Sequence, residues 1–471
     1  MISSGALPAT TDVLVIGAGP AGIAAARSAS ACGADVVVLD EYARPGGQYF
    51  RQSRLGRPID PSVVGRSQSI GAGEIAQLDC KKVRVVTDAL VWGCFDDRSI
   101  AYVHDGASHT ISAGAIVLAT GAYERPVGFP GWTLPGVMTA GAAQTMLKEQ
   151  GVRVGTRVVL AGTGPFLYPV STQLAAAGAQ LVAVCEAVRD PLWLLRSPQA
   201  LRQADKLREA VGYLARAVRH RLPLRFGWTV VEARGDGRVE EVVLAKLDKD
   251  WRVDGTAQRV VAADTVLINF GFIPNLQLPR LAGCAVEWDA VLSTYCTRHD
   301  EDQQTTQPGV YVAGEATGLG GHRVAMGEGR IAGTMAAAAV GLLDRSLAAE
   351  RLAPVRDQLG RDRAFVDHVN HTFAIRDGIY DLLRDDVVVC RCEEVEAASI
   401  KRVATDWDGS LRAIKQCTRA GMGPCQGRIC DSMVARLAAR ASGRAIPDLG
   451  LDSVRPAVKP LMLQSFQPSN S

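Results

Sequence analysis

Short apolar runs recur along most of the chain, and several of them end at a glycine or an acidic residue. Residues 13–17 (VLVIG), 36–40 (VVVLD) and 115–122 (AIVLATGA) are runs of this kind. Apolar runs of this length, bounded by turn signals, predict buried strands. An alanine-rich stretch between the first two runs predicts a helix, so the pattern indicates an α/β fold.

The first run ends in a glycine-rich fingerprint, Gly17-Ala-Gly19-Pro20-Ala21-Gly22. Such a segment between a strand and a helix suits the pyrophosphate of a dinucleotide. Gly17 permits the tight turn, Gly19 lets the phosphate approach, and Gly22 lets the helix pack closely on the strand. The N-terminus of the helix then presents free N–H groups to the phosphate.

Two acidic residues, Asp40 and Glu41, follow the second apolar run. An acid about twenty residues after the fingerprint hydrogen-bonds a ribose hydroxyl of the nucleotide. We assign this role to Asp40 because it ends the apolar run, with Glu41 as the alternative. Strand, helix and acid agree, so the sequence predicts a dinucleotide site.

A second fingerprint follows residues 157–162 (RVVLAG), but it lacks its third glycine. Gly162, Gly164 and Pro165 form the loop, and Leu167 stands where a glycine would let the helix approach. We therefore expect a wider turn or a shifted phosphate at this site.

Glu186 ends the next apolar run (LVAVCE) and is placed to hold a ribose. An acid at this position disfavours a 2′-phosphate, and hence NADP. Three interpretations remain open: NAD(H), a structural adenine nucleotide such as ATP, or a site that has lost its ligand. The bulky segment at residues 165–167 argues against productive hydride delivery.

The composition fits a soluble α/β protein, with 471 residues, 47% hydrophobic residues, 21% charged residues and 48 glycines. A net charge of +3 without a basic run gives no indication of nucleic-acid binding. The first residues lack the features of a signal peptide, and no apolar stretch is long enough to span a membrane. Eleven cysteines without an export signal predict a cytoplasmic protein with reduced thiols, and peripheral membrane association stays open.

Four cysteines near the end form a C-x-C…C-x4-C array: Cys390, Cys392, Cys425 and Cys430. Thiolates at this spacing suit an iron–sulfur cluster, with a structural zinc ion as the main alternative. Three glycines around Cys425 can turn backbone N–H groups toward cluster sulfurs. Cys417 precedes this loop, so we interpret it as a packing residue, with a ligand role as the alternative.

Three further segments resemble the FAD domain of the glutathione-reductase and thioredoxin-reductase superfamily. They are residues 45–48 (PGGQ, with Gly46, Gly47 and Gln48), the turn at Thr120-Gly121, and residues 309–315 (GVYVAGE, with Gly314 and Glu315). The resemblance implies that Glu315 holds the ribityl chain of FAD, although the superfamily usually has Asp there. His322 and Arg323, at the start of the next helix, either lie near the flavin ring or pack the loop.

The dithiol members of that superfamily place a C-x-x-C or C-x4-C pair beside the flavin. This chain has no such pair before residue 390. Electrons must therefore leave its flavin by another route, and a disulfide reductase is a poor interpretation.

The cysteine segment CRCEEV…GMGPCQGRIC resembles the bacterioferritin-associated-ferredoxin-like domain, over about residues 386–445. This resemblance implies a [2Fe–2S] cluster on the four cysteines. The free-standing ferredoxin ends its array with C-x2-C, whereas this chain has C-x4-C. The wider spacing resembles the version fused to larger flavoprotein subunits.

The order of these motifs resembles the larger accessory subunit of heteromeric amine-oxidising flavoenzymes. That group includes the opine oxidases, D-hydroxyproline dehydrogenase, dye-linked L-proline dehydrogenase and hydrogen cyanide synthase. The resemblance implies two Rossmann-like domains of the glutathione-reductase type and a small C-terminal α+β iron–sulfur domain. It also implies FAD, an FMN at a subunit boundary, and ATP at the second nucleotide site in some relatives.

The same resemblance implies that a partner flavoprotein, similar to D-amino-acid oxidase, oxidises the C–N bond of an amino acid, imino acid or opine. A small third subunit with another cluster can complete the complex. We could place no catalytic base on this chain, which agrees with such a division of labour. The alternatives are a hydrogen cyanide synthase subunit that oxidises glycine, a self-sufficient NADH oxidoreductase, and a cluster-bearing scaffold that only binds nucleotides.

We expect the following division of the chain. The helical insertion has apolar positions spaced by three and four, for core packing or for docking a partner. The predicted parts are 1–150 and 271–343 (FAD domain), 151–270 (second nucleotide domain, with a helical insertion at 190–222), 344–385 (helical linker), 386–447 (cluster domain) and 448–471 (extended arm over a partner or solvent).

Overall fold

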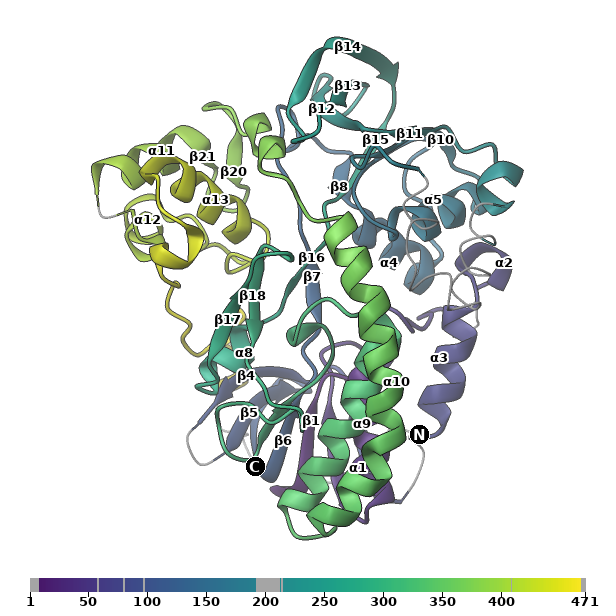
Figure 1. Cartoon of the computed structure of the whole chain (residues 1–471), viewed down its shortest axis with the longest axis vertical. Coiled ribbons are helices and arrows are strands. Elements are labelled where there is room, and N and C mark those ends of the chain that lie inside the picture. Colours follow the sequence, from purple (N-terminus) through teal and green to yellow (C-terminus); the bar gives the residue numbers. More distant parts are fainter. Residues whose placement is uncertain are drawn as a thin grey trace.

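The computed structural model describes residues 8–56, 59–78, 81–95, 98–191, 212, 215–407 and 409–466. Most of the predicted helical insertion, with Trp193 at its start, therefore lies outside the described residues. Two sheet-containing domains lie one above the other in Figure 1, and a small domain of short helices lies beside them. Within the described residues, no helix is both long and apolar enough to cross a membrane.

The first sheet has the strand order β3-β2-β1-β6-β5-β4, and β19 pairs with β6. Its central strands are parallel, with Val13 opposite Val36 and Ala115. Three of the apolar runs named above form β1, β2 and the end of β6, and they are buried. The strands are β1 (Thr10–Ile16), β2 (Val36–Leu39), β3 (Val83–Val86), β4 (Leu90–Cys94), β5 (Ser99–His104), β6 (Ala107–Leu118) and β19 (Val310–Val312).

Two helices with small side chains, α1 and α9, pack against each other beside this sheet. A Cβ atom on Gly329 or Gly333 of α9 would lie 2.1 Å from a backbone oxygen of α1, so only glycine allows this approach. The long helix α10 packs on the other side of α9 (Figure 1). The helices of this domain are α1 (Pro20–Ala31), α2 (Pro61–Val64), α3 (Ser67–Ala76), α9 (Gly321–Ala339) and α10 (Arg345–Thr372).

Two short antiparallel strands, β7 (Ala122–Glu124) and β16 (Phe272–Pro274), carry the chain into the second domain and back. The return crossing lies where the sequence predicts it. The outward crossing comes before the predicted boundary at residue 150, because β8 pairs with β15 and α4 packs in the second core. That part of the predicted boundary is therefore wrong.

The second sheet is parallel throughout, with the order β11-β10-β9-β15-β8, and a three-stranded antiparallel sheet lies above it. The elements are β8 (Val137–Thr139), α4 (Ala140–Gln150), β9 (Arg157–Gly162), α5 (Leu167–Ala176), β10 (Gln180–Glu186), β11 (Leu224–Phe226), β12 (Trp228–Arg234), β13 (Glu241–Leu247), β14 (Val253–Ala262) and β15 (Thr265–Asn269). Between the return crossing and β19 lie α8 (Gln277–Leu281), β17 (Val286–Asp289) and β18 (Thr294–Thr297).

The cysteine array belongs to a small domain that shares one hydrophobic core with the second nucleotide domain. Trp132 donates its indole N–H to the carbonyl of Val388 at 2.6 Å, which fixes this contact. Its elements, with the short helices that flank it, are η3 (Asp377–Leu382), β20 (Val388–Cys390), β21 (Val395–Glu396), α11 (Ala397–Asp406), α12 (Leu411–Thr418), α13 (Asp431–Ser442), η4 (Ile446–Leu449) and η5 (Leu463–Phe466).

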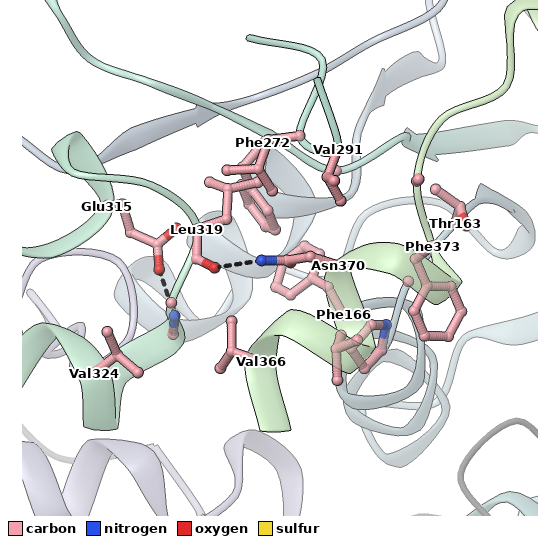
Figure 2. Close-up of a pocket in the computed structure, with 18 of the residues that line it drawn as sticks. Thr163, Phe166, Phe272, Val291, Glu315, Leu319, Val324, Val366, Asn370 and Phe373 are labelled. Atoms are coloured by element: carbon pink, nitrogen blue, oxygen red, sulfur yellow. Dashed lines mark hydrogen bonds between the residues drawn. The ribbon is translucent and has the colours of Figure 1, made fainter. Parts of the chain in front are cut away.

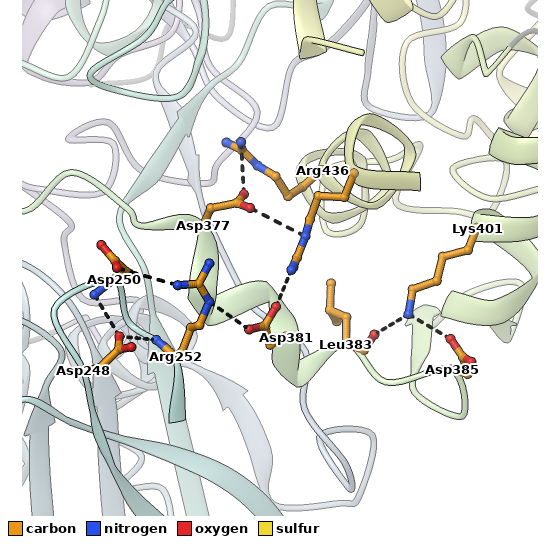
Figure 3. A network of polar contacts seen from close by, with 10 residues as sticks. Asp248, Asp250, Arg252, Asp377, Asp381, Leu383, Asp385, Lys401 and Arg436 are labelled. Atoms are coloured by element: carbon orange, nitrogen blue, oxygen red, sulfur yellow. Dashed lines mark hydrogen bonds and ion pairs between the residues drawn. The ribbon is translucent and has the colours of Figure 1, made fainter. Parts of the chain in front are cut away.

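Ion pairs link the small domain to the second domain through η3 (Figure 3). Arg252 lies 3.8 Å from Asp381, and Arg440 pairs with the same carboxylate from α13. These groups are partly exposed, so each pair contributes about 1 kcal/mol or less. The shared apolar core therefore contributes more to this attachment than the ion pairs do.

Two further predictions about the chain ends need correction. The segment 344–385 is helical as expected, but α10 packs along α9 as part of the first domain and is more than a linker. The arm after residue 448 packs on this chain itself, because Val458 is buried in the core of the first sheet. Its amide donates to the carbonyl of Trp92 at 3.2 Å.

Candidate functional site

The first glycine-rich loop needs glycine at two of its three positions for steric reasons. Gly17 has a φ of +103°, and a Cβ there would lie 2.3 Å from the carbonyl oxygen of Ala119. A Cβ on Gly22 would lie 1.7 Å from the carbonyl oxygen of Gly17. Side chains are thus excluded where α1 approaches β1 and β6, as the fingerprint predicts.

Gly19 is different, because the protein leaves space beside it. The nearest atom to a Cβ there would be the Cα of Gly47, at 3.8 Å. Gly46 donates its N–H to the carbonyl of Ala18 at 2.7 Å, which holds the second glycine turn over the loop. Helix α1 starts at Pro20 without a side-chain cap, so its first N–H groups can meet a phosphate.

Asp40 and Glu41 point to different partners. Asp40 accepts hydrogen bonds from the N–H groups of Ala18 at 2.5 Å and Tyr42 at 2.8 Å, and burial raises its pKa to about 6. Glu41 forms an ion pair with Lys459 of the C-terminal arm. Asp40 is thus the acid that contacts the glycine loop, and its role as a ribose ligand stays a prediction.

The turn at Thr120-Gly121 is held by the return crossing. Thr120 donates its hydroxyl proton to the carbonyl of Asn275 at 2.8 Å, and Asn275 donates its N–H to the carbonyl of Gly121 at 2.9 Å. No atom lies within 4 Å of a Cβ on Gly121, so this turn also faces open space. Gln48 donates to the hydroxyl of Tyr42 at 3.1 Å, on the other side of the glycine loop.

The segment Gly314-Glu315 joins β19 to α9. Glu315 accepts the N–H of Gly321 at 2.8 Å, at the first turn of α9 (Figure 2). Burial, and then the nearby charge of Glu328, raise the pKa of Glu315 to about 7. Glu328 itself accepts the N–H of Gly314 at 2.8 Å and pairs with Arg363 of α10 at 2.8 Å.

Glu328 was missed by the sequence analysis. It lies inside a helix that is otherwise rich in alanine and glycine, and it is 2% exposed. A lone acid in such a helix was the available signal, because a buried carboxylate requires donors nearby. Its partners come from two distant segments, which the sequence alone does not bring together.

A cavity of about 290 Å³ lies between the first turn of α9, the crossing strands and the end of α10 (Figure 2). Its walls are mainly apolar and aromatic, with Phe272 and Phe166 in edge-to-face contact at 5.3 Å between ring centroids. Glu315 and the first residues of α9 line one end, and the second glycine loop lines another. The cavity can thus hold a flat ring system that enters from the first domain.

Besides Glu315, the cavity is lined by Arg125, by His322, and by Arg323, which pairs with Asp362 at 3.2 Å. Arg125 is 3% exposed and donates to the carbonyls of Leu292 at 2.8 Å and Ser293 at 3.1 Å, while its Nε has no partner within the described residues. Burial lowers its pKa. His322 lines the cavity and stacks on Tyr49 at 4.0 Å between ring centroids, which supports the packing role, while its place near a flavin ring stays a prediction.

The second glycine loop has the wider turn that the missing glycine predicts. Helix α5 starts at Leu167, five residues after Gly162, whereas α1 starts three residues after Gly17. Leu167 is buried in the core, and its side chain takes the place that a closely packed helix would need. Gly164 has a φ of +104° with no atom within 4 Å of a Cβ, so this loop also has open space.

Glu186 anchors the second loop in the way that Asp40 anchors the first. It accepts from the hydroxyl of Thr163 at 2.9 Å and the N–H groups of Gly164 at 2.9 Å and Val188 at 3.0 Å. Burial raises its pKa to about 7. Pro165 lies beside Phe166 in the wall of the cavity.

The four cysteines of the array come together at one end of the small domain, as two contacting pairs. Cys390 forms a hydrogen bond with Cys430, and Cys392 with Cys425. The contact with Cys430 and the N–H groups of three neighbouring residues lower the pKa of Cys390 to about 5. Among the described residues, no three or more His, Cys, Asp or Glu side chains lie close enough together to hold one metal ion.

The loop glycines lie where the sequence predicts them. Gly421 donates its N–H toward the sulfur of Cys390, and Gly427 toward that of Cys425. Cys417 is exposed on α12, so its interpretation as a packing residue was wrong.

Two family models match the chain. The model described as pyridine nucleotide-disulphide oxidoreductase covers residues 11–340, and the one described as the sarcosine oxidase A3 domain covers residues 386–467. The chain is thus an oxidoreductase with two Rossmann-like domains and a C-terminal A3-type domain. This confirms the predicted two-domain α/β fold.

Comparison with individual proteins narrows this class. An opine oxidase subunit from Rhizobium meliloti is 34% identical over 469 residues, which span 96% of this chain and 86% of that protein. Hydrogen cyanide synthase subunit HcnB of Pseudomonas aeruginosa is 34% identical over 481 residues, which span 96% of this chain and 98% of that protein. The chain belongs to the family of these oxidoreductase subunits, which confirms the resemblance seen in its motifs.

A solved structure agrees over the whole length. L-proline dehydrogenase from P. horikoshii matches with a TM-score of 0.68 at 20% identity, over 98% of this chain and 80% of that one. At this identity the likeness shows the shared fold.

Proposed function

We propose that this chain is the electron-transfer subunit of a heteromeric dehydrogenase, with FAD in its first domain. The observation that carries the proposal is the presence, in one domain, of open space beside Gly19 and Gly121 and of Glu315 in the wall of the cavity at the first turn of α9. These three features suit the pyrophosphate, the ribityl chain and the ring of a flavin.

The residues of this site have distinct tasks. Asp40 would hold the ribose, and the N-terminus of α1 the pyrophosphate. Glu315 would hold the ribityl chain, while the first turn of α9 and Arg125 place positive charge at the ring end. FAD at this site supplies two-electron redox chemistry.

We further propose that Cys390, Cys392, Cys425 and Cys430 hold a [2Fe–2S] cluster. Two contacting thiol pairs suit a centre with two irons better than a zinc ion, for which four thiolates must converge on one point. Backbone N–H groups directed at the sulfurs also favour a cluster. Such a cluster supplies one-electron chemistry.

Replacing one cysteine tests this assignment. We expect Cys430→Ser to lose iron and acid-labile sulfide while it keeps its flavin. Cys417→Ser is the matched control, because Cys417 is exposed and belongs to neither thiol pair. Equal iron content in both variants would contradict the assignment.

The substrate is then oxidised elsewhere. The relatives are named for opines, hydrogen cyanide synthesis and L-proline, so we propose an amino acid, imino acid or opine as the electron source. The C–N oxidation would take place on a partner flavoprotein similar to D-amino-acid oxidase. FMN at the boundary between the two proteins and a small iron–sulfur protein would complete the complex.

One observation favours a second candidate, a self-sufficient NADH oxidoreductase. Thr163, Gly164 and Phe166 of the second loop line the same cavity as Glu315, so a dinucleotide there could reach the flavin. Against it, Phe166 and Phe373, the residue that follows α10, occupy the wall of the same cavity with bulky rings (Figure 2). We therefore propose a structural adenine nucleotide, such as ATP, at the second loop.

Anaerobic mixing separates the two candidates. In the proposed complex, an amine substrate bleaches the FAD of this chain only when the partner flavoprotein is present, and NADH has no effect. Rapid bleaching of the isolated chain by NADH would contradict the proposal and favour the second candidate.

A further inference from the structure

The side chain of Arg428 lies between the two proposed cofactor sites. It belongs to the loop that joins Cys425 to Cys430, and its Nη1 donates to the carbonyl of Cys425 at 3.0 Å. Its Nε donates to the hydroxyl of Tyr123 at 2.8 Å, in the outward crossing strand β7. The guanidinium therefore links the cysteine loop directly to the first domain.

A chain of hydrogen bonds continues from Tyr123 to the flavin turn. Asn275 donates to the hydroxyl of Tyr123 at 3.1 Å and to the carbonyl of Thr120 at 3.3 Å. Thr120 donates in turn to the carbonyl of Asn275 at 2.8 Å. Four side chains thus connect Cys425 with the turn at Gly121 without a gap.

The same guanidinium holds two further segments in place. Its Nη2 donates to the carbonyl of Val458 in the C-terminal arm at 2.9 Å and to the side chain of Gln277 in α8. Gln277 also donates to the carbonyl of Gln426 in the cysteine loop at 3.2 Å. No carboxylate among the described residues pairs with Arg428, so its donors serve backbone and neutral groups.

Arginine suits this place because its planar group presents five donors in a fixed geometry. A lysine could reach one or two of these acceptors, but it could not hold four segments at once. The ring of Tyr123 lies 5.4 Å from the guanidinium carbon, which adds a cation–π contact.

We propose that Arg428 is a positioning residue, which fastens the cysteine loop to the flavin turn through Tyr123 and Asn275. This proposal deepens the proposed function and rests on it. In the transfer concerned, the flavin is oxidised by one electron and the cluster is reduced by one. An external one-electron acceptor, such as a quinone or a dye, then takes that electron before a second one follows.

Two variants interrupt this chain of hydrogen bonds at different residues. Arg428→Met keeps the length of the side chain but removes its donors, and Tyr123→Phe keeps the ring but removes the hydroxyl. Arg436→Met is the matched control, because Arg436 also reaches from the small domain to the first, where it donates to Ser293 at 2.5 Å. It also pairs with Asp377 at 3.2 Å (Figure 3) and lies over the ring of Tyr380, and its contacts among the described residues include neither Tyr123 nor the cysteine loop.

The experiment uses the full-length chain with its cofactors, and it has three readouts. They are iron and flavin content, hydrogen exchange of residues 421–428, and the rate at which the electron paramagnetic resonance signal of the reduced cluster appears after photoreduction of the flavin. We expect normal cofactor content in all variants. Exchange should become at least about tenfold faster in Arg428→Met, because the variant loses all four hydrogen bonds of the guanidinium and the loss of a single charge-assisted one already implies this factor. We expect the cluster signal to appear about tenfold more slowly.

Tyr123→Phe should shift both quantities in the same direction by a smaller factor, and Arg436→Met should leave them unchanged. Unchanged exchange and unchanged rate in Arg428→Met and Tyr123→Phe would overturn the positioning role. An unmodified chain without a reducible cluster would instead reject the proposed function. The exchange measurement would then still decide whether Arg428 fastens the loop.

Discussion

The two glycine-rich loops show how one backbone design gives two different sites. In both, an acid at the end of the neighbouring strand accepts a loop N–H: Asp40 from Ala18 at 2.5 Å and Glu186 from Gly164 at 2.9 Å. They differ at the third fingerprint position, where Gly22 lets α1 approach and Leu167 fills the space instead.

This difference teaches which part of the fingerprint carries which property. The strand, the first glycine and the acid shape the turn in both domains. The third glycine decides how close the helix dipole comes to a bound phosphate. In the first domain α1 therefore packs closely behind the loop, whereas in the second domain α5 starts two residues later and Leu167 fills the space behind the loop.

The largest effect is expected from a side chain placed in the first loop, because it should remove the difference between the two loops. Gly22→Val would place its Cβ 1.7 Å from the carbonyl oxygen of Gly17, so α1 must move away from β1. We expect protein without bound FAD, measured as the flavin released per chain after denaturation. Gly73→Ala in α3 is the control, because no atom lies within 4 Å of its Cβ. Full flavin content in Gly22→Val would contradict the steric account.

Shortening the side chain of Leu167 in the second loop should lower the free energy of unfolding but leave FAD bound. Leu167 is buried among apolar side chains, so Leu167→Ala should lower the free energy of unfolding by about 2–4 kcal/mol. Urea unfolding followed by circular dichroism measures this change. Leu167→Met should cost less than about 1.5 kcal/mol. A flavin content that falls along with stability would show that the two loops are not independent.

The raised pKa of Glu186 in the second loop predicts that the stability of the fold depends on pH. Burial raises the pKa of Glu186 from 4.5 to about 7, so between these values the folded chain holds a proton that the unfolded chain has lost. Stability contributed by this group therefore falls as the pH rises through that window. The slope approaches about 1.4 kcal/mol per pH step of one, the free energy of a tenfold change in proton binding.

Glu186→Gln removes this titration. Urea unfolding at several pH values should show the unmodified chain losing stability relative to the variant between pH 4.5 and about 7, and a constant difference above. A pH-independent difference throughout would show that the carboxyl is not desolvated.

The smallest expected effect is that of Glu41→Gln on stability. Glu41 pairs with Lys459 at the surface, so this change should alter the unfolding free energy by less than about 1 kcal/mol and leave FAD binding intact. Asp40→Asn should weaken FAD binding, as judged by flavin retained after dialysis. Equal flavin retention in the two variants would undo the assignment of Asp40.

Much of the fold could be predicted from the sequence, because strands, glycine turns and acids follow one another at short range. Gly17, Gly22 and Asp40 lie within one βαβ unit. Their spacing alone predicts the tight turn at Gly17, the close approach of the helix at Gly22 and an acid beside the loop at Asp40. The wider second turn was likewise visible in Leu167.

The features that escaped prediction depend on long-range contacts. Arg125 lines the cavity only because the crossing strands bring it beside Leu292. The helix after residue 344 resembled a linker because its charged residues are conspicuous, whereas the apolar residues that join it to the first core are few: Ala348, Leu352, Val355, Leu359 and Val366. The sequence around Val458 in the C-terminal arm has no pattern that predicts its burial in the core of the first sheet.

One measurement tests the central claim, that this chain relays electrons between a flavin and an iron–sulfur centre. The chain is purified together with its partner flavoprotein, and its FAD, adenine nucleotide, iron and acid-labile sulfide are determined per chain. The account predicts one FAD on this chain, and two irons and two sulfides bound by its cysteines. A chain that carries no flavin or no iron would contradict it.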